Sequence, residues 1–261
     1  RLVCLSLPAC IRHGGHRGSH RLRHCAMNNP SDIKAPPPLL ELRDVQRSYL
    51  QGTVKLDVLY NANLSVRAGE MKALVGPSGS GKSTLLNIAG LLERPDAGEV
   101  LIDGVDADKL GRANRGNLRR SHIGFVFQFH RLLPEFSALE NVMIPQMLNG
   151  LDRNEAAKRA EQLLAMVGLQ SRADHRPGLL SGGEQQRVAI ARSMANAPRV
   201  LLADEPTGNL DPETARDVFH HLSMITRATG TAALVVTHNQ QLALKMDSIL
   251  TIGDGKIVSI G

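Results

Sequence analysis

The chain has no tryptophan, few other aromatic residues and little cysteine. Its 261 residues include two tyrosines and five phenylalanines, and its three cysteines all fall within the first 25 residues. The rest of the chain therefore offers no disulfide and no cysteine-ligated metal site, a composition that fits a reducing compartment. No stretch approaches the roughly 18 consecutive apolar residues that a membrane-spanning helix needs, so we expect no such helix.

Net charge is also low outside the N-terminal end. The formal net charge of the whole chain is +6, but residues 1–26 contain five arginines and no acidic residue. The remainder is close to neutral and does not predict the basic surface that is typical of nucleic-acid-binding proteins. We therefore expect no nucleic-acid partner.

The N-terminal stretch differs in composition from the rest. We interpret residues 1–38 as a disordered or non-native extension with the true start at Met27, because a polar, proline-containing lead-in follows that methionine. Two alternatives stay open. A short apolar run near the N-terminus is compatible with a signal peptide. Four histidines are compatible with metal binding, although such tracts are usually solvated: His13, His16, His20 and His24.

Beyond that extension, short apolar segments alternate with helix-forming segments. This alternation predicts a mostly parallel sheet covered by helices on both faces. We expect strands at residues 39–45, 71–76, 123–128, 199–205 and 232–238, and a terminal hairpin at residues 249–261 with Asp254-Gly255 as its turn. From about residue 129 to residue 176 the pattern is helical.

A glycine-rich loop stands between the second predicted strand and a helix. It reads Gly76-Pro77-Ser78-Gly79-Ser80-Gly81-Lys82-Ser83 and matches the phosphate-binding pattern G-x-x-x-x-G-K-[ST] at every fixed position. Glycines let backbone N–H groups surround phosphates, Lys82 adds a charge at the β- and γ-phosphates, and the Ser83 hydroxyl is a ligand for Mg²⁺. We predict that these residues and Thr84 bind a nucleotide. The alternative is a glycine-rich turn with a surface lysine.

Two acidic residues end the fourth predicted strand. Asp204 and Glu205 follow a wholly apolar run and so stand at the carboxyl end of a buried strand, where doubly wound sheets bind ligands. We assign Asp204 to a metal ion and Glu205 as the general base for an attacking water. The alternative is a strand end with two solvated acids.

A second glycine-rich stretch, LLSGGEQQRVAIARSM at residues 179–194, precedes another helix. Ser181 and Glu184 have the spacing of a capping box, so this stretch can be a plain helix start. Small residues before a helix N-terminus can also hold an anion. The spacing alone leaves both interpretations open.

Taken in order, these motifs resemble those of the ATP-binding-cassette (ABC) ATPases, over roughly residues 39–261. The resemblance implies an α/β fold of the P-loop NTPase type: a mostly parallel sheet core, an N-terminal antiparallel β part and an inserted α-helical lobe at about residues 129–187. It adds sites beyond the phosphate loop and the acidic pair: Tyr49 stacking on adenine, the Q-loop Gln128, the signature Leu180, Ser181, Gly182, Gly183 and Glu184, the D-loop Asn209, Leu210 and Asp211, and the switch histidine His238.

The same resemblance implies cofactors and a dimer. ATP and Mg²⁺ would bind, with Ser83, Gln128 and Asp204 at the metal. Lys82, Gln128, Glu205 and His238 would take part in hydrolysis. Cassettes of this family pair head to tail, so residues 180–184 would close over the nucleotide of a second copy, and Asp211 would connect the two sites.

Several longer phrases, such as FQFHRLLPEFSALENVMIPQ and LLADEPTGNLD, resemble the ATPases of bacterial lipoprotein-releasing transporters. That resemblance implies two membrane-spanning partner subunits, lipoprotein cargo bound by those subunits, and a peripheral location on the cytoplasmic face of the bacterial inner membrane. Residues 129–149 would form the groove for the partners, although their apolar residues can instead be lobe core: Leu132, Leu133, Phe136 and Met143. The alternatives are the ATPase of a macrolide-export or cell-division complex, and a soluble nucleotide-dependent clamp.

Overall fold

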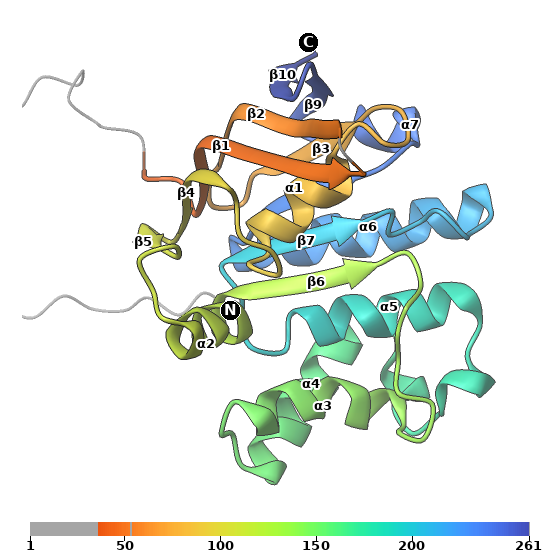
Figure 1. Ribbon diagram of the computed structural model, residues 1–261. Coiled ribbons are helices and arrows are strands. Elements are labelled where there is room, and N and C mark those ends of the chain that lie inside the picture. The colour runs from red at the N-terminus through yellow and green to blue at the C-terminus, as the bar shows by residue number, and fades with distance from the viewer. Residues whose placement is uncertain (1–35, 53, 261) are drawn as a thin grey trace, which may run out of the picture. The chain divides into compact units, whose positions relative to one another are not determined.

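The structure, a computed structural model, describes residues 36–52 and 54–260 (Figure 1). The expectations for Met27 and for the extension up to residue 35 lie outside these residues. No helix in the described part of the chain is long and apolar enough to cross a membrane.

A six-stranded sheet forms the centre of the fold, in the order β10-β9-β3-β8-β7-β6. Five strands are parallel: β3 (Met71–Val75), β6 (Ile123–Phe127), β7 (Val200–Asp204), β8 (Ala232–Val236) and β9 (Ser248–Gly253). The last strand, β10 (Lys256–Ser259), is antiparallel to β9. Asp254 and Gly255 both have positive φ angles, of 50° and 73°, as a two-residue hairpin turn requires. The predicted parallel sheet and terminal hairpin are confirmed.

A second, antiparallel sheet has the order β2-β1-β4-β5. Its strands are β1 (Leu40–Gln51), β2 (Val54–Val66), β4 (Ala97–Ile102) and β5 (Val105–Asp106). The N-terminal antiparallel part is thus confirmed, but the strand pattern had predicted only the first half of β1. Tyr60 N–H donates to the Gly255 carbonyl at 2.8 Å, so the C-terminal turn is joined to β2.

The helices lie around the six-stranded sheet. They are α1 (Lys82–Ala89), α2 (Arg112–His122), α3 (Ala138–Leu148), α4 (Arg153–Met166), α5 (Gly182–Ser193), α6 (Pro212–Thr229) and the short α7 (Gln240–Ala243), with 3-10 turns at Gln170–Arg172 and Pro177–Leu179. Figure 1 shows α3 and α4 beside α5, below the sheet in that view, and these three helices pack on one another. The expectation of helix from residue 129 was wrong: residues 128–137 form a loop, and α3 starts only where the Ser137 and Glu140 capping box permits it.

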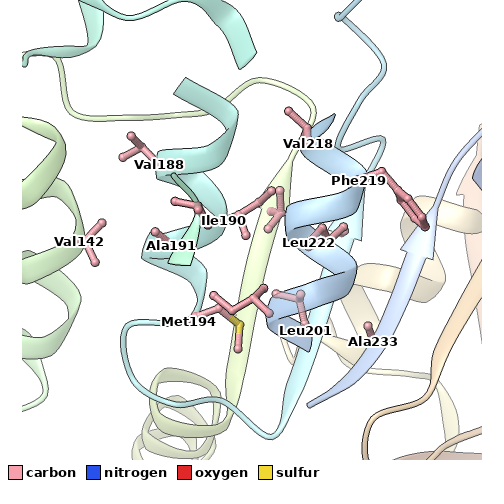
Figure 2. Packing of buried hydrophobic residues seen from close by; sticks show 14 of the residues in the cluster. Val142, Val188, Ile190, Ala191, Met194, Leu201, Val218, Phe219, Leu222 and Ala233 are labelled. Carbon is pink, nitrogen blue, oxygen red and sulfur yellow. The ribbon is translucent and has the colours of Figure 1, made fainter. Parts of the chain in front are cut away.

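The central strands send alternate side chains into two hydrophobic cores. Leu201 and Ala203 of β7 and Ala233 of β8 pack with α3, α4, α5 and α6, and Figure 2 shows Leu201 and Ala233 in that core. Leu202 and Leu234 point the other way, toward α1 and the antiparallel sheet. Burial on both faces explains why β7 and β8 are apolar throughout rather than alternating. The parallel arrangement brings the carboxyl ends of β3, β6, β7 and β8 to one edge of the sheet.

Candidate functional site

A cavity of about 490 Å³ lies at this edge and gathers most of the predicted site residues. The residues come from four strand ends and from β2. They are Val58, Ser78, Gly79, Gly81, Lys82, Ser83, Thr84, Gln128, Asp204, Glu205, Val236 and His238. Sequence reasoning missed only Val58 and Val236 in this lining. The apolar alternation of residues 54, 56, 58, 62, 64 and 66 is the signal that could have placed Val58 on a strand.

The phosphate loop depends on glycine at three positions. Gly76, Gly79 and Gly81 have φ angles of 144°, 79° and 97°, in a region that L side chains rarely adopt. A Cβ at Gly81 would also stand only 2.9 Å from Val58 Cγ1. The side-chain ammonium of Lys82 donates to the carbonyls of Gly76 at 2.9 Å and Pro77 at 2.6 Å, so its charge lies over the loop.

One polar atom in this loop has no partner. The Ser80 hydroxyl is buried and makes no hydrogen bond within the described part of the chain. A buried polar group without a partner is costly, and it is satisfied when a ligand supplies one. The loop thus offers backbone N–H groups, an ammonium and an unpaired hydroxyl to an anionic group such as a phosphate.

The acidic pair crowds negative charge beside this loop. Burial, and then the neighbouring Glu205, raise the pKa of the Asp204 carboxyl, while Lys82 and Arg131 oppose the shift. No group of three or more His, Cys, Asp or Glu side chains among the described residues could hold a metal ion alone. Mg²⁺ takes one or two protein carboxylates and completes its coordination with phosphates and water. The half-buried Asp204 carboxylate and the Ser83 hydroxyl fit that ion.

Glu205 is held in an unusual backbone conformation. Its φ angle is 48°, in the left-handed region, and its N–H donates to the Val236 carbonyl at 2.9 Å. The carboxylate oxygen Oε2 lies 2.9 Å from His238 Nδ1 and accepts from the His238 backbone N–H at 3.2 Å. A strained backbone persists only where its surroundings determine it, and such residues cluster at active sites. The strand-end glutamate and the histidine that follows β8 are therefore joined directly.

The predicted Q-loop and D-loop are also joined. Gln128 follows β6, and its Nε2 donates to Asn209 Oδ1 at 2.9 Å. Leu210 packs against the core of the helices. Asp211 caps α6 by accepting from the backbone N–H groups of Glu213 and Thr214, each at 3.1 Å. These bonds, and first of all one with the Thr214 side chain, lower the pKa of the Asp211 carboxyl.

The signature residues 180–184 do not line the cavity of their own chain. Ser181 is exposed and forms both bonds of a capping box: its hydroxyl accepts from Glu184 N–H at 3.3 Å, and its N–H donates to Glu184 Oε2 at 2.8 Å. Leu180 and Gly183 are buried, and a Cβ at Gly183 would clash with the Thr214 side chain on α6. The stretch is thus a capping box in its own chain and also presents an exposed helix start to whatever lies outside.

Tyr49 lies apart from the cavity lining. Its hydroxyl donates to Glu93 Oε1 at 2.7 Å, and the Arg47 guanidinium lies 4.7 Å from the ring centroid. The ring is 37% exposed. The structure therefore does not bring Tyr49 to the other site residues, and its contact with adenine stays a prediction.

A phosphate loop, an acidic strand end, a glutamine, a histidine and an exposed capped signature helix, arranged around one sheet, define an ATP-binding cassette. The family model described as "ABC transporter" matches residues 59–208, and the chain belongs to that family.

Individual relatives have more specific names than the family model. The chain is 58% identical over 221 residues to the "Lipoprotein-releasing system ATP-binding protein LolD" of Paramagnetospirillum magneticum, covering 85% of this chain and 98% of the relative. It is 56% identical over 227 residues to the LolD protein of Nitrobacter winogradskyi, covering 87% and 98%. Among solved structures, a dimer of the ATP-binding cassette MJ0796 in a post-hydrolysis state with ADP and Pi has a TM-score of 0.75 and 40% identity, covering 84% of this chain and 96% of that one.

Proposed function

We propose that the chain is the ATP-hydrolysing subunit of a transporter that releases lipoproteins from the bacterial inner membrane for delivery to the outer membrane. The observation that carries the proposal is the 58% identity to a lipoprotein-releasing ATP-binding protein across 98% of that relative's length. The cavity supports the hydrolytic part of the proposal, because a phosphate loop with its lysine, a carboxylate for a metal ion, a general base and a histidine line it together.

The phosphate loop binds the nucleotide in this proposal. Backbone N–H groups of residues 78–84 hold the phosphates, and Lys82 exchanges its bonds with the loop carbonyls for the β- and γ-phosphate oxygens. Asp204, Ser83 and Gln128 would hold Mg²⁺. When bound, that ion neutralises the phosphate oxygens and orients them.

Glu205 accepts the proton of the attacking water. Its carboxylate is near the carboxyl ends of β7 and β8, and His238 fixes one of its oxygens. Both residues line the nucleotide cavity. The pairing also keeps His238 beside the position of the γ-phosphate, so one hydrogen bond orients two catalytic groups.

The signature serves a second copy of the chain. Its exposed Ser181 and the helix start behind it point to no nucleotide of their own chain, and helix N-termini favour anions. Solved relatives include cassette dimers. A head-to-tail pair would place each signature over the partner's phosphates, with Asp211 between the two sites.

The membrane subunits dock on an apolar groove beside the loop that follows β6. A cavity of about 370 Å³ is lined mostly by apolar residues and three arginines, together with Ser193 and Asn196: Leu92, Ile123, Gly124, Phe125, Phe127, Pro145, Leu148, Arg119, Arg120 and Arg192. Loop residues Phe129, Leu133 and Phe136 are exposed, whereas Met143 is buried in the core and Leu132 packs against it. The groove fits an apolar helical segment that carries a negative charge.

This docking also implies a domain organisation and a location for the chain. Residues 39–261 form one cassette, and the helices between about residues 129 and 187 form a lobe that follows the membrane subunits. The protein is then peripheral, on the cytoplasmic face of the inner membrane, and cargo contacts only the membrane subunits.

The test is a pull-down of the tagged chain from detergent-solubilised bacterial membranes in the presence of ATP and vanadate. Two membrane subunits together with a lipidated protein would support the proposal. An efflux or cell-division partner would overturn the assignment of lipoproteins as the cargo, and the absence of any membrane partner would favour a soluble clamp. Leu148→Glu, an exposed position in the groove, should lose the partners, and Leu244→Glu, equally exposed but outside the groove, should keep them.

A further inference from the structure

Side chains of the signature helix α5 make three hydrogen bonds to backbone carbonyls, one at the end of β6 and two in the loop that follows it. Near its start, Gln186 Nε2 donates to the Phe127 carbonyl at 3.1 Å. In its last turn, Arg192 Nη2 donates to the His130 carbonyl at 2.8 Å and Nη1 to the Arg131 carbonyl at 2.7 Å. These carbonyls flank Gln128, which lines the nucleotide cavity.

Arg192 makes the stronger part of this contact. Its planar guanidinium can serve two carbonyls at once, and a bond from a charged donor is stronger than a neutral one. The Gln186 side chain makes one bond and leaves its own carbonyl oxygen buried without a partner in the described part of the chain. The loop is therefore held chiefly through Arg192.

The charged guanidinium of Arg192 is partly removed from water and has no acidic partner among the described residues. The side chain is half-buried, and burial lowers the pKa of its guanidinium, with no carboxylate among the described residues to oppose the shift. Partial desolvation of an arginine without an acidic partner is unfavourable. The two loop carbonyls are its hydrogen-bond partners, so the position is explained by what it holds.

The segment that Arg192 holds is itself strained. Arg131 has a φ angle of 48°, in the left-handed region that a residue with a Cβ rarely adopts. Its guanidinium lies 4.3 Å from the centroid of the Phe127 ring, so the turn folds back on the strand that precedes it. A strained turn persists because its neighbours determine it, and Arg192 bonds the carbonyl at that very residue.

Arg192 and Phe127 also line the apolar groove. The Arg192 side chain thus lines the groove and bonds the loop that carries Gln128. It belongs to the same helix whose start carries the exposed Ser181. We propose that Arg192 is a positioning residue that makes residues 128–131 and the signature helix move as one body, so that occupation of the groove reaches both Gln128 and Ser181. The step from groove to membrane partner rests on the proposed function; the mechanical link does not.

The link itself is tested without any partner, by hydrogen exchange in the whole 261-residue chain. Arg192→Lys keeps the charge, but lysine is shorter and lacks the planar fork in which two separate nitrogens each donate to one carbonyl. The amide of Leu133, which donates to Asn141 Oδ1 at 2.8 Å, reports on the order of this loop. We expect it to exchange about tenfold faster in this variant, within the range by which a coupling contact changes stability. Arg187→Lys is the matched control, because Arg187 is a half-buried arginine on the same helix that bonds Asp217 of α6 and lies outside the groove. Unchanged exchange in Arg192→Lys, or equal changes in both variants, would overturn the proposal.

A second measurement separates the link from the proposed function. With membrane subunits present, we expect Arg192→Lys to lower the ratio of partner-stimulated to basal ATP hydrolysis by about tenfold, while Arg187→Lys keeps the ratio within about twofold. An unaltered ratio in Arg192→Lys would refute the transmitting role. If the wild-type chain finds no membrane subunit, the proposed function fails, and the exchange measurement still decides the mechanical link.

Discussion

Replacement of Glu205 by glutamine isolates the chemistry of the site from its structure. Glutamine has the size of glutamate, and its carbonyl oxygen can still accept from the His238 backbone N–H that the carboxylate accepts from at 3.2 Å. The backbone bond from Glu205 N–H to Val236 is unaffected. What disappears is a group that can take a proton from water.

A general base contributes about 10²–10⁴-fold to a rate, which is about 3–5 kcal/mol of activation free energy. Glu205 is half-buried, but glutamine has the same shape and its carbonyl oxygen can take the place of Oε2 beside His238. We therefore expect folding stability to change by less than about 0.5 kcal/mol, or about 2 °C in Tm for a domain of this size. We therefore expect Glu205→Gln to lose at least about 100-fold in phosphate release. It should keep nucleotide binding, keep its Tm and accumulate as an ATP-bound dimer.

The assay combines phosphate release at saturating ATP with thermal unfolding and sedimentation, with Glu213→Gln as the control. Glu213 lies in the first turn of α6, outside the cavity, and should hydrolyse ATP as the wild type does. Hydrolysis by Glu205→Gln within a few-fold of wild type would refute the base assignment. A loss of activity accompanied by a Tm drop well beyond the expected 2 °C would refute the argument that the effect is chemical.

Three other substitutions test other parts of the site. Burial and Glu205 raise the pKa of Asp204, so the ionised form of this carboxyl destabilises the folded protein above its ordinary pKa. Asp204→Asn should therefore raise the Tm of the nucleotide-free protein at pH 7 and weaken Mg²⁺-dependent ATP binding. A lower Tm would contradict this destabilising effect. The Ser181 backbone N–H, together with Arg172, lowers the pKa of Glu184, so its contribution to stability is complete above about pH 4.5 and is lost as pH falls below that value. The free energy of unfolding should therefore depend less on pH, below about pH 4.5, in Glu184→Gln than in the wild type. An identical pH dependence in the two proteins would exclude a stabilising role for the Glu184 carboxylate. Ser181→Arg should abolish hydrolysis, by about 100-fold or more, yet leave nucleotide affinity of the monomer unchanged in equilibrium dialysis; a parallel loss of affinity would mean that the signature serves its own chain.

The sequence predicted the site better than the fold around it. The phosphate loop has fixed residue types at fixed spacing, because backbone approach to phosphate tolerates few alternatives. Asp204 and Glu205 were found because a buried parallel strand is apolar along its whole length and its end is therefore visible. Neighbouring carboxyl ends then meet at one edge by geometry.

The antiparallel sheet was harder to predict, for physical reasons. In β2 the alternation is interrupted by a polar segment at Asn61, whose φ angle is 48°, and one face of the sheet is exposed. Helix α2 has few apolar residues, and its inner side is anchored by Arg115, which is buried against Asp108 and the Glu93 carbonyl. A pattern of hydrophobicity cannot detect an anchor that is charged.

Contacts between residues that are far apart in the sequence could not be predicted from the sequence. The bond between Glu205 and His238 depends on the left-handed backbone at Glu205, and no residue pattern encodes that angle for a glutamate. The contact of Arg192 with the loop carbonyls is likewise invisible, because backbone acceptors carry no residue identity.

The backbone at Glu205 also sets two kinds of selection against each other. Glycine adopts a φ angle of 48° without the cost of about 1–2 kcal/mol that a side chain incurs there. A library screened for heat resistance alone should therefore enrich glycine or asparagine at position 205, and each enriched clone would be catalytically dead. A library screened for growth would retain glutamate and its strain. The position is thus a place where the most stable version of this protein and the working version differ in sequence.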